Sequence, residues 1–289
     1  MEKVTFINSM GQSIQLGNEE PFILTKIEGT GAASTNIQTQ KSPFQDGETY
    51  IDNLLEPRSI SIEIIVLAND SKEMIKNRRK LLQVLNPKLG EGKLVYDYGD
   101  IKREIKAISE NAPVFPDDGD FKDTMQPALI QLYCSNPFWL DTFTESQELA
   151  DWVGGLMFPL QLPMMFAGRS SRQHTIIHNA GDVETPIVFE FLGAATNPRI
   201  TKIDTGEYIQ VNRTIKNNER LIITTEFGNK KVILKNINTG EETNAFGWID
   251  LGSTFFQLIV GDNLISYSAD AGQETAKVWI KWRNRYVGV

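Results

Sequence analysis

Hydrophobic residues recur at every second position over residues 59–67, the pattern of a β-strand that buries one face, and Ile65 and Leu67 make the end of the stretch apolar on both faces. The predicted inner face consists of Ile60, Ile62, Ile64 and Val66. Three further stretches have strand-like composition, at residues 94–98, 103–108 and 128–134. The first half of the chain is therefore predicted to be mainly β.

One helix is predicted within these strands. Asp70, followed three residues later by Glu73, is close to a capping box with Asp in place of Ser or Thr. Asn86-Pro87 ends the helix, because proline disfavours helical geometry at the residue before it. Apolar residues recur between these signals at helical spacing: Met74, Ile75, Leu81, Leu82 and Leu85. The pattern predicts a helix over about 71–85. We interpret its basic residues as a solvated face rather than as a partner-binding patch.

The stretch between Glu28 and Leu55 has few large apolar residues and many Thr, Ser, Gln and Asn residues. Such a segment cannot build a hydrophobic core of its own. Two interpretations stay open from the residues alone: a flexible loop, or an arm that a neighbouring chain orders.

The last third of the chain is patterned almost entirely as short strands. Residues 221–227 and 230–234 flank Gly228-Asn229, which predicts a hairpin with a two-residue turn. In the final strand, Ala276, Val278, Ile280 and Trp282 fall on one face. Short strands separated by regular turn signals indicate an antiparallel β-sandwich.

Length and composition fit a folded protein of two domains. The chain has 289 residues, of which 40% are hydrophobic and 23% are charged. Its single cysteine excludes an intrachain disulfide and a cysteine-rich metal site. We find neither an apolar signal core nor a run long enough to cross a bilayer, so we expect synthesis in a cytoplasm without membrane insertion. The formal net charge of −8 argues against specific nucleic-acid binding.

Candidate catalytic and metal-binding chemistry is sparse. His174 and His178 flank strand-favouring residues, and on a strand they lie roughly 13 Å apart, too far to share one ion. The acidic cluster of Asp117, Asp118, Asp120 and Asp123 misses the EF-hand spacing, which favours a solvated loop over adventitious Ca²⁺ binding. The G-x-S-x-G motif is absent. We therefore predict no catalytic, cofactor-binding or metal-binding residues.

Four tryptophans raise the alternative of a sugar-stacking surface in the C-terminal half. Packing in the core or at its rim is the favoured interpretation for each of them. They are Trp152, Trp248, Trp279 and Trp282.

The hexapeptide Cys134–Trp139 lies near the midpoint of the chain. Its Asn136-Pro137 pair breaks regular structure, and Phe138 and Trp139 offer large apolar surfaces that anchor a buried corner. The hexapeptide also resembles the junction in phage distal tail proteins, a family of siphovirus tail components. Strings similar to that family recur in order along the chain: Arg79–Leu82, Leu85–Pro87, Leu94–Tyr98, Asn179–Gly181 with Pro186, Gly206–Ile209 and Tyr286–Val289.

The resemblance implies a mainly β fold of two domains. Residues 1–140 would form a ring-forming, tail-tube-like domain that is β-sandwich-like, with one helix at about 71–85. An extended arm at about 28–57 would add to a neighbour's sheet. Residues 141–289 would form a galectin-like antiparallel β-sandwich that includes its connecting segment.

The resemblance also implies a structural role and no enzymatic activity. The expected assembly is a homo-hexameric hub at the distal tail end of a siphophage or prophage virion. It would join the tail-tube protein to a tail-tip, fibre or lysin protein and leave a channel for DNA. Negative net charge suits a channel that must not retain a polyanion. A carbohydrate-binding adhesin for a host surface is the alternative, and a cell-wall hydrolase would need a catalytic grouping that the sequence does not mark.

Overall fold

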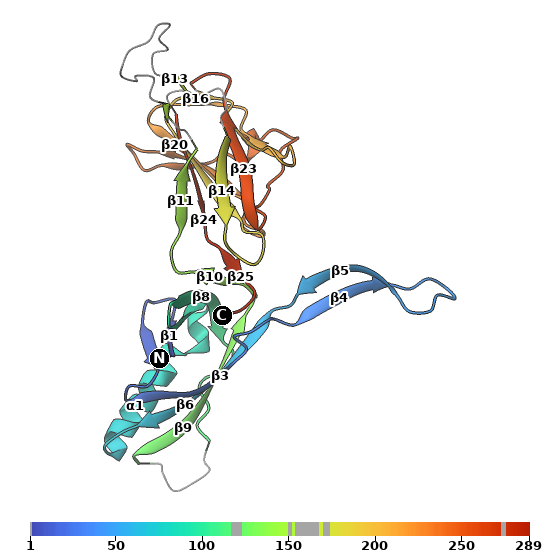
Figure 1. The fold of residues 1–289 in the computed structure, drawn as a ribbon. Coiled ribbons are helices and arrows are strands. Elements are labelled where there is room, and N and C mark those ends of the chain that lie inside the picture. Colours follow the sequence, from blue (N-terminus) through green and yellow to red (C-terminus); the bar gives the residue numbers. More distant parts are fainter. Residues whose placement is uncertain (1, 117–122, 150–151, 154–167, 170–173, 273–275) are drawn as a thin grey trace, which may run out of the picture. The chain divides into compact units, whose positions relative to one another are not determined.

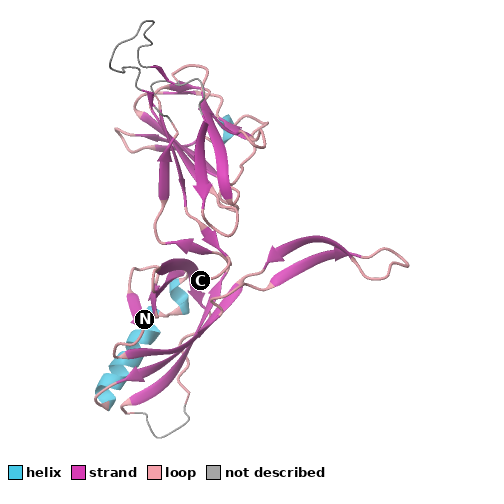
Figure 2. Cartoon of the chain, in the orientation of Figure 1, coloured by secondary structure: helices cyan, strands magenta, loops and turns pink. Residues whose placement is uncertain are grey.

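The computed structural model describes residues 2–116, 123–149, 152–153, 168–169, 174–272 and 276–289 (Figure 1). The chain divides into two compact units, Met1–Thr142 with Tyr286–Val289, and Phe143–Arg285. Strands dominate both units (Figure 2). Residues 286–289, although they end the chain, belong to the first unit.

The first unit is built on one antiparallel sheet in the order β2-β1-β7-β8-β9-β6-β3. A parallel bridge between Gly17 and Ile23 joins the two ends of this order, so the sheet curls and closes on itself. Strand β10 (Trp139–Asp141) pairs with β8 and with β25 (Arg285–Tyr286). The strands of the main order are β1 (Lys3–Ile7), β2 (Ser13–Leu16), β3 (Phe22–Glu28), β6 (Arg58–Leu67), β7 (Gly92–Tyr98), β8 (Ile101–Ser109) and β9 (Met125–Cys134).

The core of the first unit follows the predicted alternation. Ile60, Ile62, Ile64 and Val66 are all buried, which confirms the predicted inner face of the strand at 59–67. Cys134 and Trp139, the ends of the hexapeptide, are also fully buried. The ring of Trp139 meets Tyr96 edge-on, with centroids 6.1 Å apart.

The predicted helix is α1 (Ser71–Val84), and the 3₁₀ turn η1 (Pro87–Leu89) follows it. The Asp70 carboxylate caps α1 by accepting a hydrogen bond of 2.8 Å from the Glu73 N–H. Met74, Leu81 and Val84 face the core, as does Leu85 just after the helix. The predicted apolar set also included Ile75 and Leu82, which are exposed. Successive helical residues are rotated by 100°, so these two side chains lie beside the buried face and not on it.

The second unit is a β-sandwich, as predicted for this half. Its larger sheet has the order β11-β24-β15-β20-β21-β22, and the smaller one has the order β14-β23-β17-β18. Inward residues of both sheets form one core, which includes Phe189, Ile223, Ile200 and Ile265. Ala276, Val278, Ile280 and Trp282 lie in it, as the alternation of the final strand predicts.

The bounds of the second unit's elements are as follows. The larger sheet contains β11 (Glu145–Glu148), β15 (Ile187–Leu192), β20 (Glu219–Thr224), β21 (Lys231–Asn236), β22 (Glu242–Asn244) and β24 (Lys277–Trp282). The smaller sheet contains β14 (His174–Asn179), β17 (Arg199–Lys202), β18 (Tyr208–Gln210) and β23 (Gly261–Ser268). Short pairs are β12 (Trp152–Val153) with β13 (Gly168–Arg169) and β16 (Ala195–Thr196) with β19 (Thr214–Ile215), and η2 (Phe246–Trp248) is a 3₁₀ turn.

The predicted two-residue turn at Gly228-Asn229 is wrong. The ladder between β20 and β21 ends at the pair Thr224 and Lys231, so the connection is longer. Thr225 leaves the ladder because its N–H and hydroxyl bond the backbone of Ile187 instead.

A candidate assembly interface on the β4–β5 arm

Strands β4 (Thr35–Gln40) and β5 (Thr49–Leu55) form a hairpin in the first unit, called the arm here. Within the described residues the two strands pair only with each other, and Figure 1 draws no third strand of that part of the chain alongside them. Every residue of β4 is exposed, as is every residue of β5 except the half-buried Leu55. The arm therefore has regular backbone structure without a core.

The register of the arm separates two faces. Thr35 pairs with Leu55 and Ile37 pairs with Asn53. After an irregularity in the ladder, Thr39 pairs with Tyr50. Ile37 and Tyr50 consequently share a face, and they are 61% and 58% exposed. The opposite face carries mainly amide and hydroxyl side chains, with Leu54 as its apolar member.

Each arm strand has one paired side and one open side. In an antiparallel ladder, alternate residues direct their N–H and C=O groups away from the partner strand. A hairpin without a third strand therefore presents two rows of hydrogen-bonding groups that a further strand can use.

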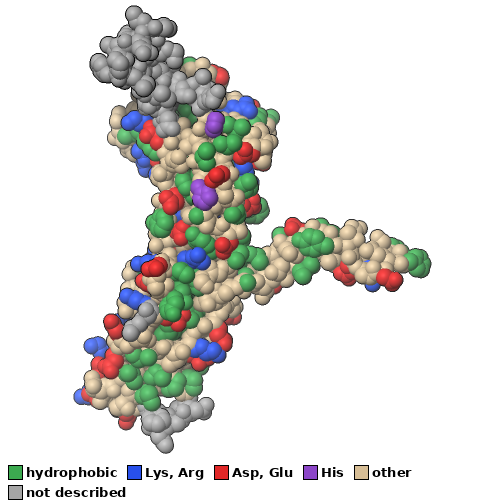
Figure 3. All heavy atoms as spheres, in the orientation of Figure 1, with side chains coloured by type: hydrophobic (Ala, Val, Ile, Leu, Met, Phe, Trp, Pro, Cys, Tyr) green, Lys and Arg blue, Asp and Glu red, His purple; other side chains and the backbone are tan. Residues whose placement is uncertain are grey.

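The far end of the arm is acidic and apolar. Between residues 35 and 55, Lys41 is the only basic residue, and Asp46, Glu48 and Asp52 are the acidic ones. Phe44 in the connecting turn is fully exposed and has a φ of 65°. Figure 3 shows hydrophobic side chains spaced along the arm and acidic side chains towards its tip.

The root of the arm is held by a buried arginine. Arg58, the first residue of β6, is only 4% exposed. Its guanidinium donates hydrogen bonds to the carbonyl oxygens of Gly29 (3.1 Å), Gly31 (2.6 Å) and Val287 (2.6 Å). One side chain thus ties the start of the arm to the last residues of the chain.

The last four residues make further contacts at this root. The Val289 N–H donates to the Thr30 carbonyl at 3.1 Å. Arg103 donates to the Gly288 carbonyl and stacks on Tyr286, with 3.5 Å between the guanidinium carbon and the ring centroid. The Tyr286 hydroxyl hydrogen-bonds to the Asp141 carboxylate at 3.2 Å.

Gly29 marks the point where the chain leaves β3 for the arm. Its φ of +87° is favourable for glycine alone, and a Cβ there would lie 2.2 Å from the Ser59 carbonyl oxygen. The close approach of the two backbones explains why this position carries no side chain.

Burial also changes two pKa values at the root. Removal from water lowers the pKa of the Arg58 guanidinium, because the charged form loses solvation. Cys134 lies opposite Arg58 in the β6–β9 ladder. Burial raises the pKa of its thiol to about 12, and the charge of Arg58 opposes that rise only in part.

The two histidines lie on strand β14, as their neighbours predicted. His178 Nδ1 is 2.7 Å from an Asp262 carboxylate oxygen, and both side chains are largely exposed. His174 is opposite Ser266 on β23. Among the residues that the structure describes, no group of three or more His, Cys, Asp or Glu side chains is placed to hold a metal ion.

Most of the acidic cluster lies outside the described residues, namely Asp117, Asp118 and Asp120. Asp123 accepts a hydrogen bond of 2.8 Å from the Ser71 hydroxyl at the start of α1. Within the described segments, no helix is long and apolar enough to span a membrane.

The described tryptophans of the second unit differ in burial and in their contacts. Trp282 is buried in the core, whereas Trp279 lies on the opposite face of β24. Trp248 on η2 is half-buried and stacks against Arg213, whose guanidinium carbon is 3.8 Å from the ring centroid. The side chain of Trp152 is outside the described residues. These positions favour packing over a shared sugar-stacking surface.

Sequence patterns did not single out Arg58 or Arg103. Arg58 directly precedes the alternating stretch and falls on its inner face, since it is two residues before Ile60. A charged residue in phase with a buried face is a signal for a buried, fully hydrogen-bonded side chain. For Arg103 we find no equivalent signal.

Two family descriptions match the chain, one in each half. "Phage tail protein RIFT-related domain" matches residues 9–134, and "Siphovirus-type tail component, C-terminal domain" matches residues 180–286. No curated protein sequence matches.

Solved structures with a similar fold come from phage tails. The crystal structure of the Dit protein (gp 19.1) of phage SPP1 aligns with a TM-score of 0.69 at 13% identity, over 98% of each chain. A chain of the phage P2 baseplate in its activated conformation with Ca aligns at 0.54 and 11% identity, over 97% of each. The same baseplate with Sr gives 0.52 and 10%, over 97% of this chain and 98% of that one.

The closed sheet with its arm, the following sandwich and both family matches together define a siphovirus tail component. Within that class, the chain belongs to the phage distal tail proteins. The protein is therefore a structural component of a phage tail or baseplate.

Proposed function

We propose that the protein assembles into a homo-hexameric ring at the distal end of the tail. The arm is the observation that supports this proposal. A pair of exposed strands without a core gains packing and hydrogen bonds when it lies on another subunit. Each copy supplies one arm and receives one arm. Such a contact is heterologous, and it generates a closed ring when the rotation between neighbouring subunits divides a full turn evenly.

The ring occupies the junction between the tail tube and the tail tip in the virion. One face contacts the tail-tube protein, the other contacts a tail-tip, fibre or lysin protein, and the lumen lets DNA pass. The formal net charge of −8 supports this role, because a protein of net negative charge does not retain the phosphate backbone. The protein acts through assembly and catalyses no reaction.

The hydrogen-bonded root keeps the arm in position for assembly. An arm that moved freely would lose much conformational freedom when it docked, and that loss would weaken the ring. Arg58, which follows the arm in the sequence, and residues 286–289 together hold the backbone at the arm's root. Less conformational freedom is therefore lost on docking.

Negative-stain electron microscopy of the full chain tests the proposal. Particles at high protein concentration should be rings with six-fold symmetry and a central hole. A variant with residues 35–55 replaced by a short Gly-Ser link should remain folded by circular dichroism yet give no rings. Rings that persist without the arm would show that the interface lies elsewhere, for example on α1.

A further inference from the structure

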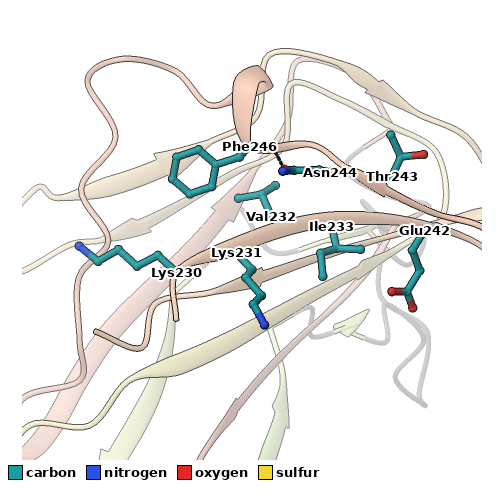
Figure 4. Close-up of a pocket in the computed structure, with 8 residues that line it drawn as sticks. All are labelled: Lys230, Lys231, Val232, Ile233, Glu242, Thr243, Asn244 and Phe246. Carbon is teal, nitrogen blue, oxygen red and sulfur yellow. Dashed lines mark hydrogen bonds between the residues drawn. The ribbon is translucent and has the colours of Figure 1, made fainter. Parts of the chain in front are cut away.

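A hollow of about 360 Å³ lies at the edge of the larger sheet in the second unit. Figure 4 shows the Phe246 ring beside Val232 and Lys230, with Asn244 joined to Phe246 by a hydrogen bond. The residues that line the hollow come from β21, the residue just before it, β22 and η2: Lys230, Lys231, Val232, Ile233, Glu242, Thr243, Asn244 and Phe246.

The strand beside this hollow has an open side. β22 is the outermost strand of its sheet, and in the described part of the chain it pairs only with β21. The Ala245 N–H donates to the Val232 carbonyl, and the Asn236 N–H donates to the Glu241 carbonyl. Because directions alternate along an antiparallel ladder, the N–H and C=O groups of Glu242 and Asn244 point away from β21. An extended peptide can pair with them.

The hollow offers an apolar contact next to this open side. Phe246 is 44% exposed, so part of its ring remains accessible. It stacks on the half-buried Phe255, with ring centroids 5.7 Å apart and planes 9° apart. Its backbone N–H donates to the Asn244 side chain at 3.0 Å, which fixes the start of η2. A fixed, partly exposed aromatic ring suits a large apolar side chain of a bound strand.

The charges around the hollow favour an acidic ligand. Glu242 is already paired with Lys235, at 2.8 Å between their charged atoms. Lys230 and Lys231 are exposed and have no carboxylate partner among the described residues. The Lys230 ammonium lies 5.4 Å from the centroid of the Phe255 ring, at the apolar part of the site. The site therefore has excess positive charge, in contrast to the net negative chain.

We propose that this site binds an extended peptide segment of another tail protein by strand addition to β22. The segment carries a large apolar residue that contacts Phe246 and a neighbouring acidic residue that pairs with Lys230 or Lys231. Backbone pairing gives affinity, and the hollow with its two lysines gives specificity. None of the residues that line this site belongs to the arm. The peptide-binding proposal can therefore be tested separately from the proposal of a hexameric ring.

Peptide selection on the immobilised full chain tests this site. A random peptide library is depleted on a Phe246→Ser variant and then selected on the wild-type protein. The recovered peptides should contain an acidic residue next to a large apolar one. Binding of fluorescent copies, measured by anisotropy, should weaken at least about tenfold with Phe246→Ser and with Lys230→Glu. Leu251→Ser, which alters a fully exposed residue that does not line the hollow, should bind as the wild type does.

Backbone methylation of a selected peptide tests strand addition itself. N-methylation of alternate amides should abolish binding in one register and spare it in the other, because only alternate peptide N–H groups face β22. Thermal unfolding of all variants should match the wild type. The proposal is overturned if no peptide distinguishes wild type from Phe246→Ser, or if both methylated peptides bind as the unmodified one does.

Discussion

The guanidinium of Arg58 donates a hydrogen bond of 2.6 Å to the carbonyl oxygen of Val287. This bond joins the strand that follows the arm to the last residues of the chain, which are 229 positions away in the sequence. The same guanidinium also holds Gly29 and Gly31. The arm's root is thus a cluster of hydrogen bonds around one buried guanidinium.

Arg58→Ala should destabilise the first unit by about 2–4 kcal/mol, because three carbonyl groups lose a charged donor and a buried side chain loses its packing. Cys134, the single cysteine, is fully buried in this unit. Its labelling by a thiol reagent across a urea series therefore reports unfolding of the first unit. Arg79→Ala on the exposed face of α1 is the control and should stay within about 0.5 kcal/mol of the wild type. An equally small effect of Arg58→Ala would show that the cluster does not stabilise the root.

Gly29→Ala and Gly47→Ala form a matched pair. Both glycines have positive φ, +87° and +74°, so both substitutions carry backbone strain of about 1 kcal/mol. Only at Gly29 does the new Cβ also meet a backbone atom, the Ser59 carbonyl oxygen, whereas nothing lies near Gly47. Gly29→Ala should therefore lower the urea midpoint clearly more than Gly47→Ala. Equal shifts would contradict the close approach at the root.

The Cys134 thiol predicts a specific loss of stability in alkaline solution. Its pKa is about 12 in the folded chain, against an ordinary value of 9.0. Above pH 9 the unfolded chain releases the thiol proton while the folded chain keeps it, so this stabilising contribution falls as pH rises towards 12. The slope is at most about 1.4 kcal/mol per pH unit.

Urea unfolding of the wild type and of Cys134→Ala, followed by circular dichroism from pH 8 to pH 11, measures this contribution. The difference in free energy of unfolding between the two proteins should be constant below pH 9 and should shrink above it. A difference that is constant throughout the range would refute the raised pKa.

Ile37→Ser with Tyr50→Ser should weaken the ring without weakening the fold. Both side chains are mostly exposed on one face of the arm, so the isolated chain loses little when they are removed. If that face lies on a neighbouring subunit, sedimentation velocity should show ring dissociation at a concentration at least about tenfold higher than for the wild type. Ile75→Ser, which removes a similarly exposed residue from α1, is the control. Dissociation caused by the control alone would place the contact on the helix.

Local patterns in the sequence predicted the elements that depend on neighbouring residues. The alternation from Ile60 to Val66 gave a strand with the correct inner face, and the Asp70 cap gave the start of α1. Spacing alone did not separate Ile75 and Leu82 from the buried residues of the helix, because adjacent stripes both carried apolar residues. The composition of residues 28–55 ruled out a core but left the loop and the arm as alternatives.

The contacts at the root were beyond prediction from one sequence. Arg58, Gly31 and Val287 meet only after the first unit has closed and the end of the chain has returned to it. No local pattern encodes such a contact. The same holds for the hollow at β22, since it depends on which strand ends at the edge of the sheet.

Hydrogen exchange of the arm amides tests directly whether the arm builds the ring. In dilute, unassembled protein, the outward-facing N–H groups of β4 and β5 should exchange quickly, because each strand has one open side. In assembled rings, alternate amides between residues 35 and 55 should become strongly protected as the arm pairs with a neighbouring subunit. Rings in which these amides exchange as quickly as in the monomer would contradict the proposal that the arm builds the ring.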